Sequence, residues 1–401
     1  MQQATNKSYI ATKISLPKGT FRPLYATCLP WGKTHHFAKK FAIVEYGGIR
    51  DLEEIEQKLP TNIVAYEWAV GFYDDENSSF LQWVRTHPST LLNTKPVRMN
   101  DYYYDMCNAK LLQKRIDYLV KKAKELNITG YFFDWANELF LEEPEFAKIK
   151  QEFHRRHKTS YASCLAKLYQ ALRQKGLMVI TNQAYRNPFL LDFIDYDMCE
   201  SYMTTIQDTN KMATIDGITT FIPTTIFQPL DEVFEYFALF QKYKKHYGFK
   251  EMIYMNYAAP EFVKKGNTIT AHSPKDIIYY NYVLGKLGGF YSFTEVPFNH
   301  TLEIDDIYFY DLGQAVSPVQ KFDNYYIRFF QKGFVILAPA LHQDRYLKLS
   351  INKKLYDLKN SLLLSPKDKG VTIKLESLYK PFENRYIPTA KVFLYADTIL
   401  H

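Results

Sequence analysis

The sequence contains few cysteines, and none of them follows a metal-binding spacing. The four are Cys28, Cys107, Cys164 and Cys199, and no C-x-x-C pair occurs. A chain of 401 residues can bury a core of its own and does not need a disulfide framework. We therefore expect free, buried thiols and no cysteine-ligated metal.

Long apolar runs and runs of like charge are also missing. No stretch reaches the ~18 apolar residues of a membrane-spanning helix. The net charge is +7, but lysine and arginine are spread along the chain, which argues against a nucleic-acid-binding arm. Residues 1–13 lack the apolar centre of a signal peptide. The chain as it stands is therefore expected in the cytoplasm, and the alternative is a periplasmic or secreted protein that has lost its export signal.

Several motifs that mark cofactors and nucleophiles are absent. The chain has no Gly-x-Gly-x-x-Gly or P-loop for a nucleotide, no His-Glu-x-x-His for zinc and no Gly-x-Ser-x-Gly around a serine nucleophile. His154 and His157 lie in a basic, polar run that is typical of a solvated surface. We expect no cofactor and no nucleic-acid partner.

What the sequence does contain is a repeated alternation of short apolar runs and amphipathic stretches. The apolar runs are typical of buried strands, and helix patterns separate most of them. Alternation of this kind gives a parallel sheet, and eight such units in roughly 260 residues match a (β/α)8 TIM barrel. The expected strands are 41–46, 62–68, 90–92, 130–134, 177–180, 193–200, 252–255 and 289–293.

The pattern changes near the C-terminus. Short strand-like runs there follow one another, separated by Gly, Pro, Asn and Asp and without amphipathic helices between them. We therefore predict an irregular lead-in over 1–40, the barrel over 41–315 and a small antiparallel β-sandwich domain over 316–401. The segment 203–229 has little periodicity, and we expect a long loop over the mouth of the barrel.

Polar side chains gather at the C-terminal ends of the expected strands, and in a barrel this end carries the active site. Amides and tyrosines suit the hydroxyls of a sugar, and cleavage of a glycosidic bond requires two carboxyl groups. Asp134 and Glu200 form the candidate pair, although acidic residues at such positions can also serve only in ion pairs. The other strand-end residues are Glu45, Tyr46, Glu67, Asn137, Asn182, Gln183, Asn256, Tyr257 and Glu295.

Four stretches of the sequence carry a family resemblance. They are 104–108 (YDMCN), 130–134 (GYFFD), 179–183 (VITNQ) and 195–201 (DYDMCES). Together they resemble glycoside hydrolase family 114, the endo-α-1,4-polygalactosaminidase group of barrel proteins. The stretch 328–335 also resembles a strand pair in the β-domain that is appended to some of these barrels. The chain departs from the family after its first strand-end aspartate, where Trp-Ala-Asn replaces the usual asparagine.

The resemblance implies a glycoside hydrolase that acts on an α-linked polysaccharide, such as an amino-sugar polymer. Asp134 would be the nucleophile, and Glu200 the general acid and then the general base, in a mechanism expected to retain the anomeric configuration. Trp135 and Tyr202 are further candidates for contact with the sugar. Two alternatives stay open: a non-catalytic carbohydrate-binding barrel acting in polysaccharide assembly or recognition, and a metal-dependent hydrolase using Glu45, Asp134 and Glu200.

Overall fold

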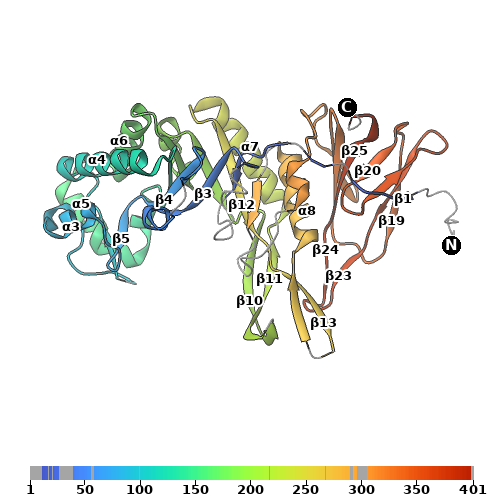
Figure 1. The fold of residues 1–401 in the computed structure, drawn as a ribbon, viewed down its shortest axis with the longest axis horizontal. Coiled ribbons are helices and arrows are strands. Elements are labelled where there is room, and N and C mark those ends of the chain that lie inside the picture. The colour runs from blue at the N-terminus through green and yellow to red at the C-terminus, as the bar shows by residue number, and fades with distance from the viewer. Residues whose placement is uncertain are drawn as a thin grey trace. The chain divides into compact units, whose positions relative to one another are not determined.

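The computed structural model divides into two compact units (Figure 1). The first unit is formed by Leu24–Glu200 and Ala238–Ile253, and the second by Met1–Pro23, Ser201–Phe237 and Tyr254–His401. The structure describes residues 11–16, 18–19, 21–26, 39–55, 58–98, 100–215, 217–266, 268–289, 292–295 and 305–398.

The first unit is built on parallel strands that are neighbours in the sheet in the same order as in the sequence. β12 (Glu251–Tyr257) begins in this unit and ends in the second, where it pairs in parallel with β15 (Ser292–Glu295). Helices separate most of the strands, so the predicted α/β barrel class is confirmed. The strands of the first unit are β2 (Tyr25–Ala26), β3 (Ile43–Gly48), β4 (Ile63–Trp68), β7 (Gly130–Asp134), β8 (Met178–Asn182) and β9 (Tyr196–Glu200).

Helices and one short strand pair complete the first unit. Strands β5 (Gly71–Tyr73) and β6 (Asp101–Tyr103) form that antiparallel pair. Helix α7 (Leu230–His246) starts in the second unit and ends in the first. The helices that lie wholly in the first unit are α2 (Ile49–Glu53), α3 (Ser79–Arg85), α4 (Ala109–Leu126), α5 (Ala147–Arg156) and α6 (Tyr161–Gln174).

Helix α4 begins and ends where its sequence carries capping residues. The side chain of Asn108 accepts hydrogen bonds of 3.1 Å from the backbone N–H groups of Lys110 and Leu111. At the other end, Asn127 adopts the left-handed conformation with a φ of 55°. Ile116, Leu119 and Ala123 recur at spacings of three and four residues, and all three are buried.

One of the expected barrel strands is wrong, and the sheet has an unexpected strand beside β3. The segment 90–92 does not join the parallel sheet, because Pro88 starts a 3₁₀ turn that runs through Thr90. Leu91 then makes only an isolated antiparallel bridge to Tyr104. The additional parallel strand is β2, within the segment expected to be an irregular lead-in. Runs of two or three residues are too short for their periodicity to distinguish a strand from a turn.

The expectation of four free thiols is wrong as well. Cys107 and Cys164 form a disulfide, with their Cα atoms 5.1 Å apart. The two residues are 57 positions apart in the sequence, and they meet because one precedes α4 while the other lies on α6, which runs beside it (Figure 1). Cys199 is free and buried, as expected. Cys28 lies outside the described residues.

The second unit consists mainly of antiparallel sheets, as predicted for the C-terminal part. Its largest sheet has the strand order β1-β21-β20-β25-β18-β17-β16. The strands of that sheet are β1 (Ala11–Lys13), β16 (Gln320–Phe322), β17 (Tyr325–Phe330), β18 (Gly333–Ala338), β20 (Leu355–Asp357), β21 (Leu362–Leu364) and β25 (Thr389–Tyr395). Two further pairs are β19 (Arg345–Leu349) with β22 (Val371–Leu375), and β23 (Leu378–Lys380) with β24 (Arg385–Ile387).

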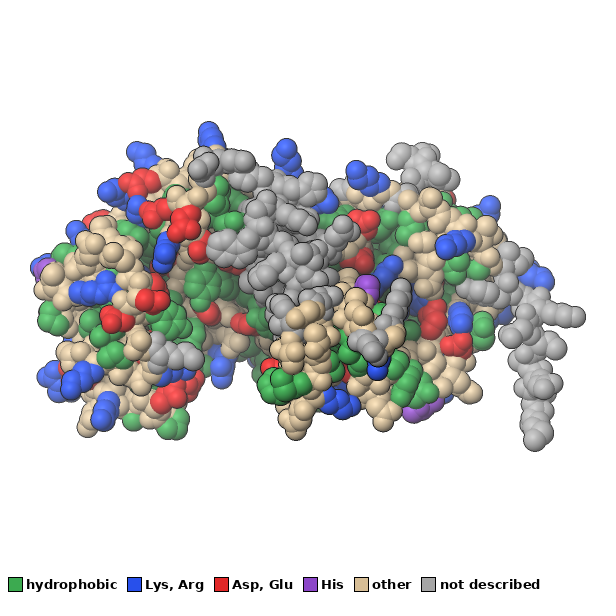
Figure 2. All heavy atoms as spheres, turned by 60° about the horizontal axis from the view of Figure 1, so that its bottom comes forward, with side chains coloured by type: hydrophobic (Ala, Val, Ile, Leu, Met, Phe, Trp, Pro, Cys, Tyr) green, Lys and Arg blue, Asp and Glu red, His purple; other side chains and the backbone are tan. Residues whose placement is uncertain are grey.

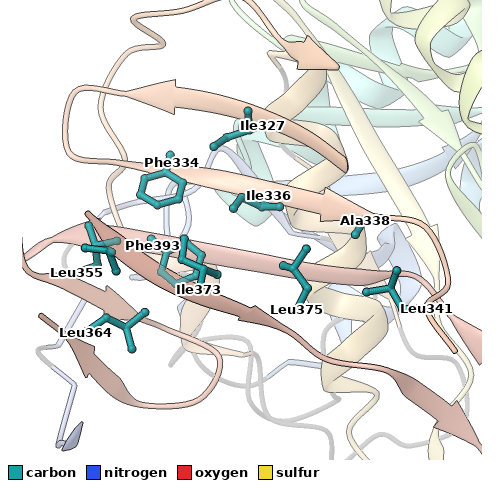
Figure 3. Close-up of a cluster of buried hydrophobic side chains, with 11 residues drawn as sticks. Ile327, Phe334, Ile336, Ala338, Leu341, Leu355, Leu364, Ile373, Leu375 and Phe393 are labelled. Carbon is teal, nitrogen blue, oxygen red and sulfur yellow. The ribbon is translucent and has the colours of Figure 1, made fainter. Parts of the chain in front are cut away.

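Alternating side chains give these sheets their core. In β22, Val371, Ile373 and Leu375 are buried while the residues between them are partly exposed. Figure 3 shows Ile373 and Leu375 in one cluster with Phe334 and Phe393, and Val371 belongs to the same cluster. The rings of Phe334 and Phe393 stack at a centroid distance of 4.9 Å. This cluster is separate from the barrel strands and gives the C-terminal part a hydrophobic core of its own.

The segment expected to be a long loop over 203–229 is instead a β-hairpin. Strands β10 (Thr204–Ile215) and β11 (Ile218–Phe227) run antiparallel along their length (Figure 1). They join β14 (Thr268–His272) and β13 (Glu261–Lys265) in a four-stranded sheet, and helix α8 (Lys275–Gly288) follows. Threonine and isoleucine are frequent in the hairpin, and both favour strands even where one face is solvated.

The surface agrees with the even spread of charge in the sequence. Lysine and arginine side chains alternate with aspartate and glutamate over the described residues on the face shown in Figure 2. Among the described helices, none combines the length and the apolar character that crossing a bilayer would require.

Candidate active site

Three neighbouring parallel strands end in Asp134, Asn182 and Glu200. Strand alternation decides where these side chains point. In β7, Tyr131 points to the surrounding helices, because its hydroxyl donates a 2.6 Å hydrogen bond to the carbonyl of Leu119 in α4. Asp134 lies three residues further along the strand, so its side chain points to the opposite face. That face is the interior of the barrel sheet.

The side chain of Asn182 connects the two predicted catalytic carboxylates. Its Nδ2 donates to Asp134 Oδ1 at 3.0 Å and to Glu200 Oε2 at 2.7 Å. The separation of these two oxygens is therefore less than the sum of the two hydrogen-bond lengths. Both bonds use the same amide nitrogen, so Asn182 Oδ1 is left without a hydrogen-bond partner among the described residues, on a side chain only 7% exposed.

Tyr66 is a residue of this site that the sequence interpretation missed. Its hydroxyl donates to Asp134 Oδ2 at 2.9 Å, and the backbone N–H of Trp135 donates to Asp134 Oδ1 at 2.8 Å. Burial and the charge of Asp134 raise the pKa of Tyr66 well above its ordinary value, so it stays a neutral donor. The signal was available: in β4, Tyr66 and Glu67 must face opposite sides, and only one of them can face Asp134.

The residue after each of these strands has a left-handed backbone. The φ angles are 51° at Trp135, 60° at Gln183 and 58° at Ser201. Such angles are uncommon for residues other than glycine, and each costs roughly 1 kcal/mol. The chain thus turns sharply after each strand-end side chain, and the strand geometry is kept up to the last residue.

The position of Trp135 is fixed by its neighbours. The guanidinium of Arg98 lies over its ring at 4.5 Å, and Arg98 is itself held by Asp101 at 3.3 Å and Glu145 at 3.0 Å. On another side, the ring of Trp68 meets it edge-on at a centroid distance of 5.9 Å. Trp135 is therefore a rigid aromatic wall beside Asp134.

A hollow of about 260 Å³ lies over the carboxylates, and we call it the carboxylate cavity. It brings together six of the residues selected from the sequence. Its full lining is Asp134, Trp135, Asn137, Leu139, Phe140, Glu143, Asn182, Gln183, Arg186 and Glu200. Leu139, Phe140, Glu143 and Arg186 come from segments that follow strands β7 and β8, and sequence interpretation did not select them.

Two of the side-chain amides in this cavity already form hydrogen bonds to other residues of the protein. Asn137 donates from Nδ2 to the carbonyl of Gln183 at 3.0 Å and accepts from the N–H of Leu139 at 2.8 Å. Gln183 Oε1 accepts from Arg186 at 3.4 Å. Asn137 therefore ties the loops after β7 and β8 together.

Strand β3 places Glu45 close to Tyr66. Glu45 is buried, and its negative charge contributes to the raised pKa of Tyr66. Tyr46, the next residue, is only partly buried, and its side chain points to the opposite face of the strand from that of Glu45. Neither residue lines the carboxylate cavity.

Glu67 faces away from the carboxylate cavity. Its Oε2 lies 3.7 Å from the guanidinium of Arg115, a buried residue of α4. Burial raises the pKa of Glu67 to about 7, although Arg115 acts to lower it. The residue lines a different cavity, which is described below.

The remaining predicted residues belong to the second unit. Asn256 is fully buried, and its Oδ1 accepts from the N–H groups of Met203 at 2.8 Å and Thr204 at 3.3 Å. The carbonyl of Tyr257 accepts from the hydroxyl of Thr204 at 2.8 Å. These contacts fix the start of hairpin strand β10.

Tyr202 and Glu295 complete the set. The hydroxyl of Tyr202 donates to the carbonyl of Glu232 at 2.7 Å. The ring centroids of Tyr202 and Tyr236 are 4.2 Å apart. Glu295 is the last residue of β15, where the structure describes only the backbone. Within the described residues, no three His, Cys, Asp or Glu side chains are grouped as a metal ion would require.

Asp197 lies in β9 three residues before Glu200, so its side chain points to the opposite face of the sheet. Its contacts there are structural. It accepts hydrogen bonds from the hydroxyl of Thr181 at 2.7 Å and from the N–H groups of Ala184 at 3.0 Å and Tyr185 at 2.7 Å. These bonds favour the charged form, yet burial outweighs them and raises the pKa of Asp197 to about 7.

We expect the free energy of unfolding to fall as the pH rises from about 4 to about 7. In this window the folded state keeps the proton on Asp197, whereas the unfolded chain has released it. The stabilisation is complete below pH ~4 and is lost as the pH passes ~7, by on the order of 3 kcal/mol. Urea unfolding at a series of pH values measures this slope.

The Asp197→Asn variant provides the comparison. Its amide cannot titrate, so its stability should depend less on pH, although it starts lower because its NH₂ group faces backbone N–H donors. Glu67 also has a raised pKa and contributes equally in both proteins, so the difference isolates Asp197. Equal slopes in the two proteins would contradict the assignment.

Comparison with known proteins gives structural neighbours only. No family model and no curated protein matches the sequence. The glycoside hydrolase domain of PelA from Pseudomonas aeruginosa is similar at 15% identity over 70% of this chain and 95% of that one, with a TM-score of 0.40. The maltogenic α-amylase AmyB from Thermotoga neapolitana is 11% identical over 93% and 98%, with a TM-score of 0.49.

A third neighbour is Ega3 from Aspergillus fumigatus, solved in complex with galactosamine. It is 8% identical over 66% of this chain and 96% of that one, with a TM-score of 0.37. At these values no role is transferred from residue to residue. The first of these neighbours is a glycoside hydrolase domain and the second an α-amylase, and the site of this chain is defined by its own geometry.

Proposed function

We propose that this protein is a glycoside hydrolase in which Asp134 is the nucleophile and Glu200 is the general acid and base. The observation that carries the proposal is the single amide of Asn182 that binds both carboxylates. Two carboxyl groups at the ends of barrel strands β7 and β9, which flank β8 beside an open cavity, are the elements that glycosidic cleavage requires.

The geometry favours a mechanism that retains the anomeric configuration. The two hydrogen bonds of Asn182, 3.0 and 2.7 Å, together span less than the ~6.5 Å at which inverting enzymes begin to accommodate a water molecule. A nearby pair instead allows Asp134 to attack the anomeric carbon directly. An ester between the sugar and Asp134 would then form as the glycosidic bond breaks.

Proton transfer would be the task of Glu200. In the first step, Glu200 gives its proton to the departing glycosidic oxygen. In the second, Glu200 takes a proton from water, the resulting hydroxide attacks the anomeric carbon, and the bond to Asp134 breaks. Both residues return to their starting protonation state, and no other reactant is consumed.

The neighbours of Asp134 would orient it for attack. Tyr66, Asn182 and the N–H of Trp135 all donate to its carboxylate, which holds both oxygens in place. Trp135 would provide an apolar wall for the sugar ring.

The substrate class that we propose is an α-linked polysaccharide such as an amino-sugar polymer, in line with the resemblance to glycoside hydrolase family 114. We also propose that the protein acts outside the cytoplasm. The disulfide between Cys107 and Cys164 supports this location, because disulfides persist mainly in oxidising compartments.

A hydrolysis screen tests the proposal. Wild-type protein and the Glu200→Gln variant are incubated with amylose, pullulan, dextran and α-1,4-linked polygalactosamine, and products are sized by mass spectrometry. Products from the wild type alone would support a glycosidase and identify its polymer. Binding without products on any polymer would favour a non-catalytic carbohydrate-binding protein instead.

The Tyr66→Phe variant should turn over about 10- to 100-fold more slowly than the wild type. It removes one of three hydrogen bonds to Asp134 but keeps the ring that packs on Phe132 at a centroid distance of 6.0 Å. Its thermal unfolding should stay close to that of the wild type. Initial rates on the polymer from the screen measure the effect.

Tyr247→Phe is the matched control for this variant, since it removes a hydroxyl from helix-flanking Tyr247 in the same unit. It should leave the rate unchanged. A Tyr66→Phe protein with wild-type kcat would show that the hydroxyl does not act on Asp134 during the reaction.

A further inference from the structure

A second cavity of about 280 Å³ lies in the first unit, and we call it the Tyr73 cavity. The turn after β3, the end of β4, strand β5 and the start of α3 surround it. Among the residues that line it are Tyr66, Glu67, Trp68, Tyr73, Glu76 and Tyr118. The mechanism proposed above uses none of these except Tyr66.

Two aromatic rings offer open faces in the Tyr73 cavity. Tyr66 and Tyr73 are 37% and 40% exposed, which is high for large rings that line a cavity. Trp68 is almost buried and stacks on Tyr73 at a centroid distance of 4.8 Å and an interplanar angle of 25°. One face of Tyr73 is thus backed by Trp68, and the exposed remainder is available to a flat, apolar ligand surface.

Polar groups in the same cavity are positioned to bind hydroxyls. The side chain of Glu67 is 21% exposed beside Arg115, and Glu76 accepts a 3.0 Å bond from the N–H of Tyr73.

Burial also affects how these acids bind. It raises the pKa of Glu67 to about 7 and that of Glu76 above its ordinary value. The carboxyl group of Glu67 can therefore donate to a hydroxyl oxygen when it is protonated and accept from a hydroxyl group when it is not. This dual capacity suits a neutral, hydroxyl-rich ligand.

Tyr66 links the two cavities through its hydrogen bond to Asp134. Its ring lines the Tyr73 cavity, while its hydroxyl donates to Asp134 in the carboxylate cavity. A ligand that extends across Tyr66 would therefore reach both places. Stacked aromatic faces together with hydrogen-bonding side chains are the features that recognise a sugar ring, which has apolar C–H faces and a polar edge.

We infer that the Tyr73 cavity is a second carbohydrate-binding site, which takes a sugar ring of the same polymer chain that is cleaved at Asp134 and Glu200. The inference rests on the proposed function for the identity of the polymer. It makes the protein a binder of oligomers that occupy at least two sites, with Tyr66 between them.

Affinity electrophoresis tests this inference. Wild type, Tyr73→Ala, Tyr73→Phe and Phe189→Ala are run in native gels that contain amylose, pullulan, dextran or α-1,4-linked polygalactosamine. Phe189 is the matched control, because it is an equally exposed ring, 47% exposed, in the same unit and lines neither cavity. Circular dichroism melts verify that each variant is folded.

The wild type should be retarded by at least one polymer. Tyr73→Ala should bind that polymer roughly tenfold more weakly, whereas Tyr73→Phe and Phe189→Ala should bind like the wild type. Equal retardation of Tyr73→Ala and wild type would overturn the inference, as would a wild type that no polymer retards. A wild type that is retarded through Tyr73 but hydrolyses nothing would overturn the proposed function and keep the second site.

Discussion

Replacing Asp134 with asparagine should lower kcat by roughly 10³-fold or more, because an amide cannot form the covalent bond to the anomeric carbon. The fold should survive. The amide oxygen can replace Oδ1 and accept from the backbone N–H of Trp135, while the hydroxyl of Tyr66, which can accept as well as donate, can turn to the amide nitrogen that replaces Oδ2. Initial rates on the cleaved polymer, together with thermal melts, separate loss of chemistry from loss of structure.

Glu142→Gln is a suitable control for this variant. Glu142 is an exposed carboxylate in the segment after β7, and it pairs with Lys150 rather than with the site. The Glu142→Gln variant should retain wild-type activity. Full activity in Asp134→Asn would remove Asp134 as the nucleophile and leave the role of the pair unexplained.

A rescue experiment gives a sharper test of the same role. In an Asp134→Gly variant, azide can enter from the side that the carboxylate occupied and attack the anomeric carbon of an activated aryl glycoside. The product should be a glycosyl azide of inverted configuration, because only one displacement has taken place. Rescue of Glu200→Gly should instead give an azide of retained configuration.

Removing the disulfide should have the largest effect on stability. The bond between Cys107 and Cys164 closes a loop over a sequence separation of 57, for which chain entropy predicts a stabilisation of about 4 kcal/mol. The double variant Cys107→Ser, Cys164→Ser should therefore unfold at a markedly lower urea concentration. Reductant should have the same effect on the wild type.

The third described cysteine provides the control. Cys199 is free and buried, and its Sγ makes only a 3.5 Å contact with the hydroxyl of Tyr185. Cys199→Ala should lose far less stability and should remain sensitive to reductant. A wild type whose urea midpoint does not respond to reductant would contradict a disulfide in the folded protein.

The strand ends were predictable because they depend on local pattern. An apolar run such as 130–134, followed by a polar residue, marks both a strand and its open end, and the residues Asp134, Asn182 and Glu200 followed from that rule. The roles within the cluster did not follow. That Asn182 binds both carboxylates depends on the register of three strands, which periodicity does not specify.

The omission of Tyr66 and the error at the cysteines both concern contacts between separate elements. Selecting charged residues near a strand end favoured Glu67 over Tyr66, although alternation allows only one of them to face Asp134. The cysteines gave no local signal, since Cys107 and Cys164 meet only through the packing of α4 beside α6. The local sequence pattern predicts helices and strands, but it does not predict which distant elements come into contact.

The left-handed residues after the three strands limit how this site can diversify. Positions 135, 183 and 201 border the strand-end residues directly, so they are natural places to vary when a new specificity is sought. Glycine and asparagine accept a positive φ at little cost, whereas valine, isoleucine and proline do not. A mutant library restricted to the first kind would therefore sample new cavity walls while the chain keeps its turns. An unrestricted library would lose many of its members to backbone strain before any of them met a substrate.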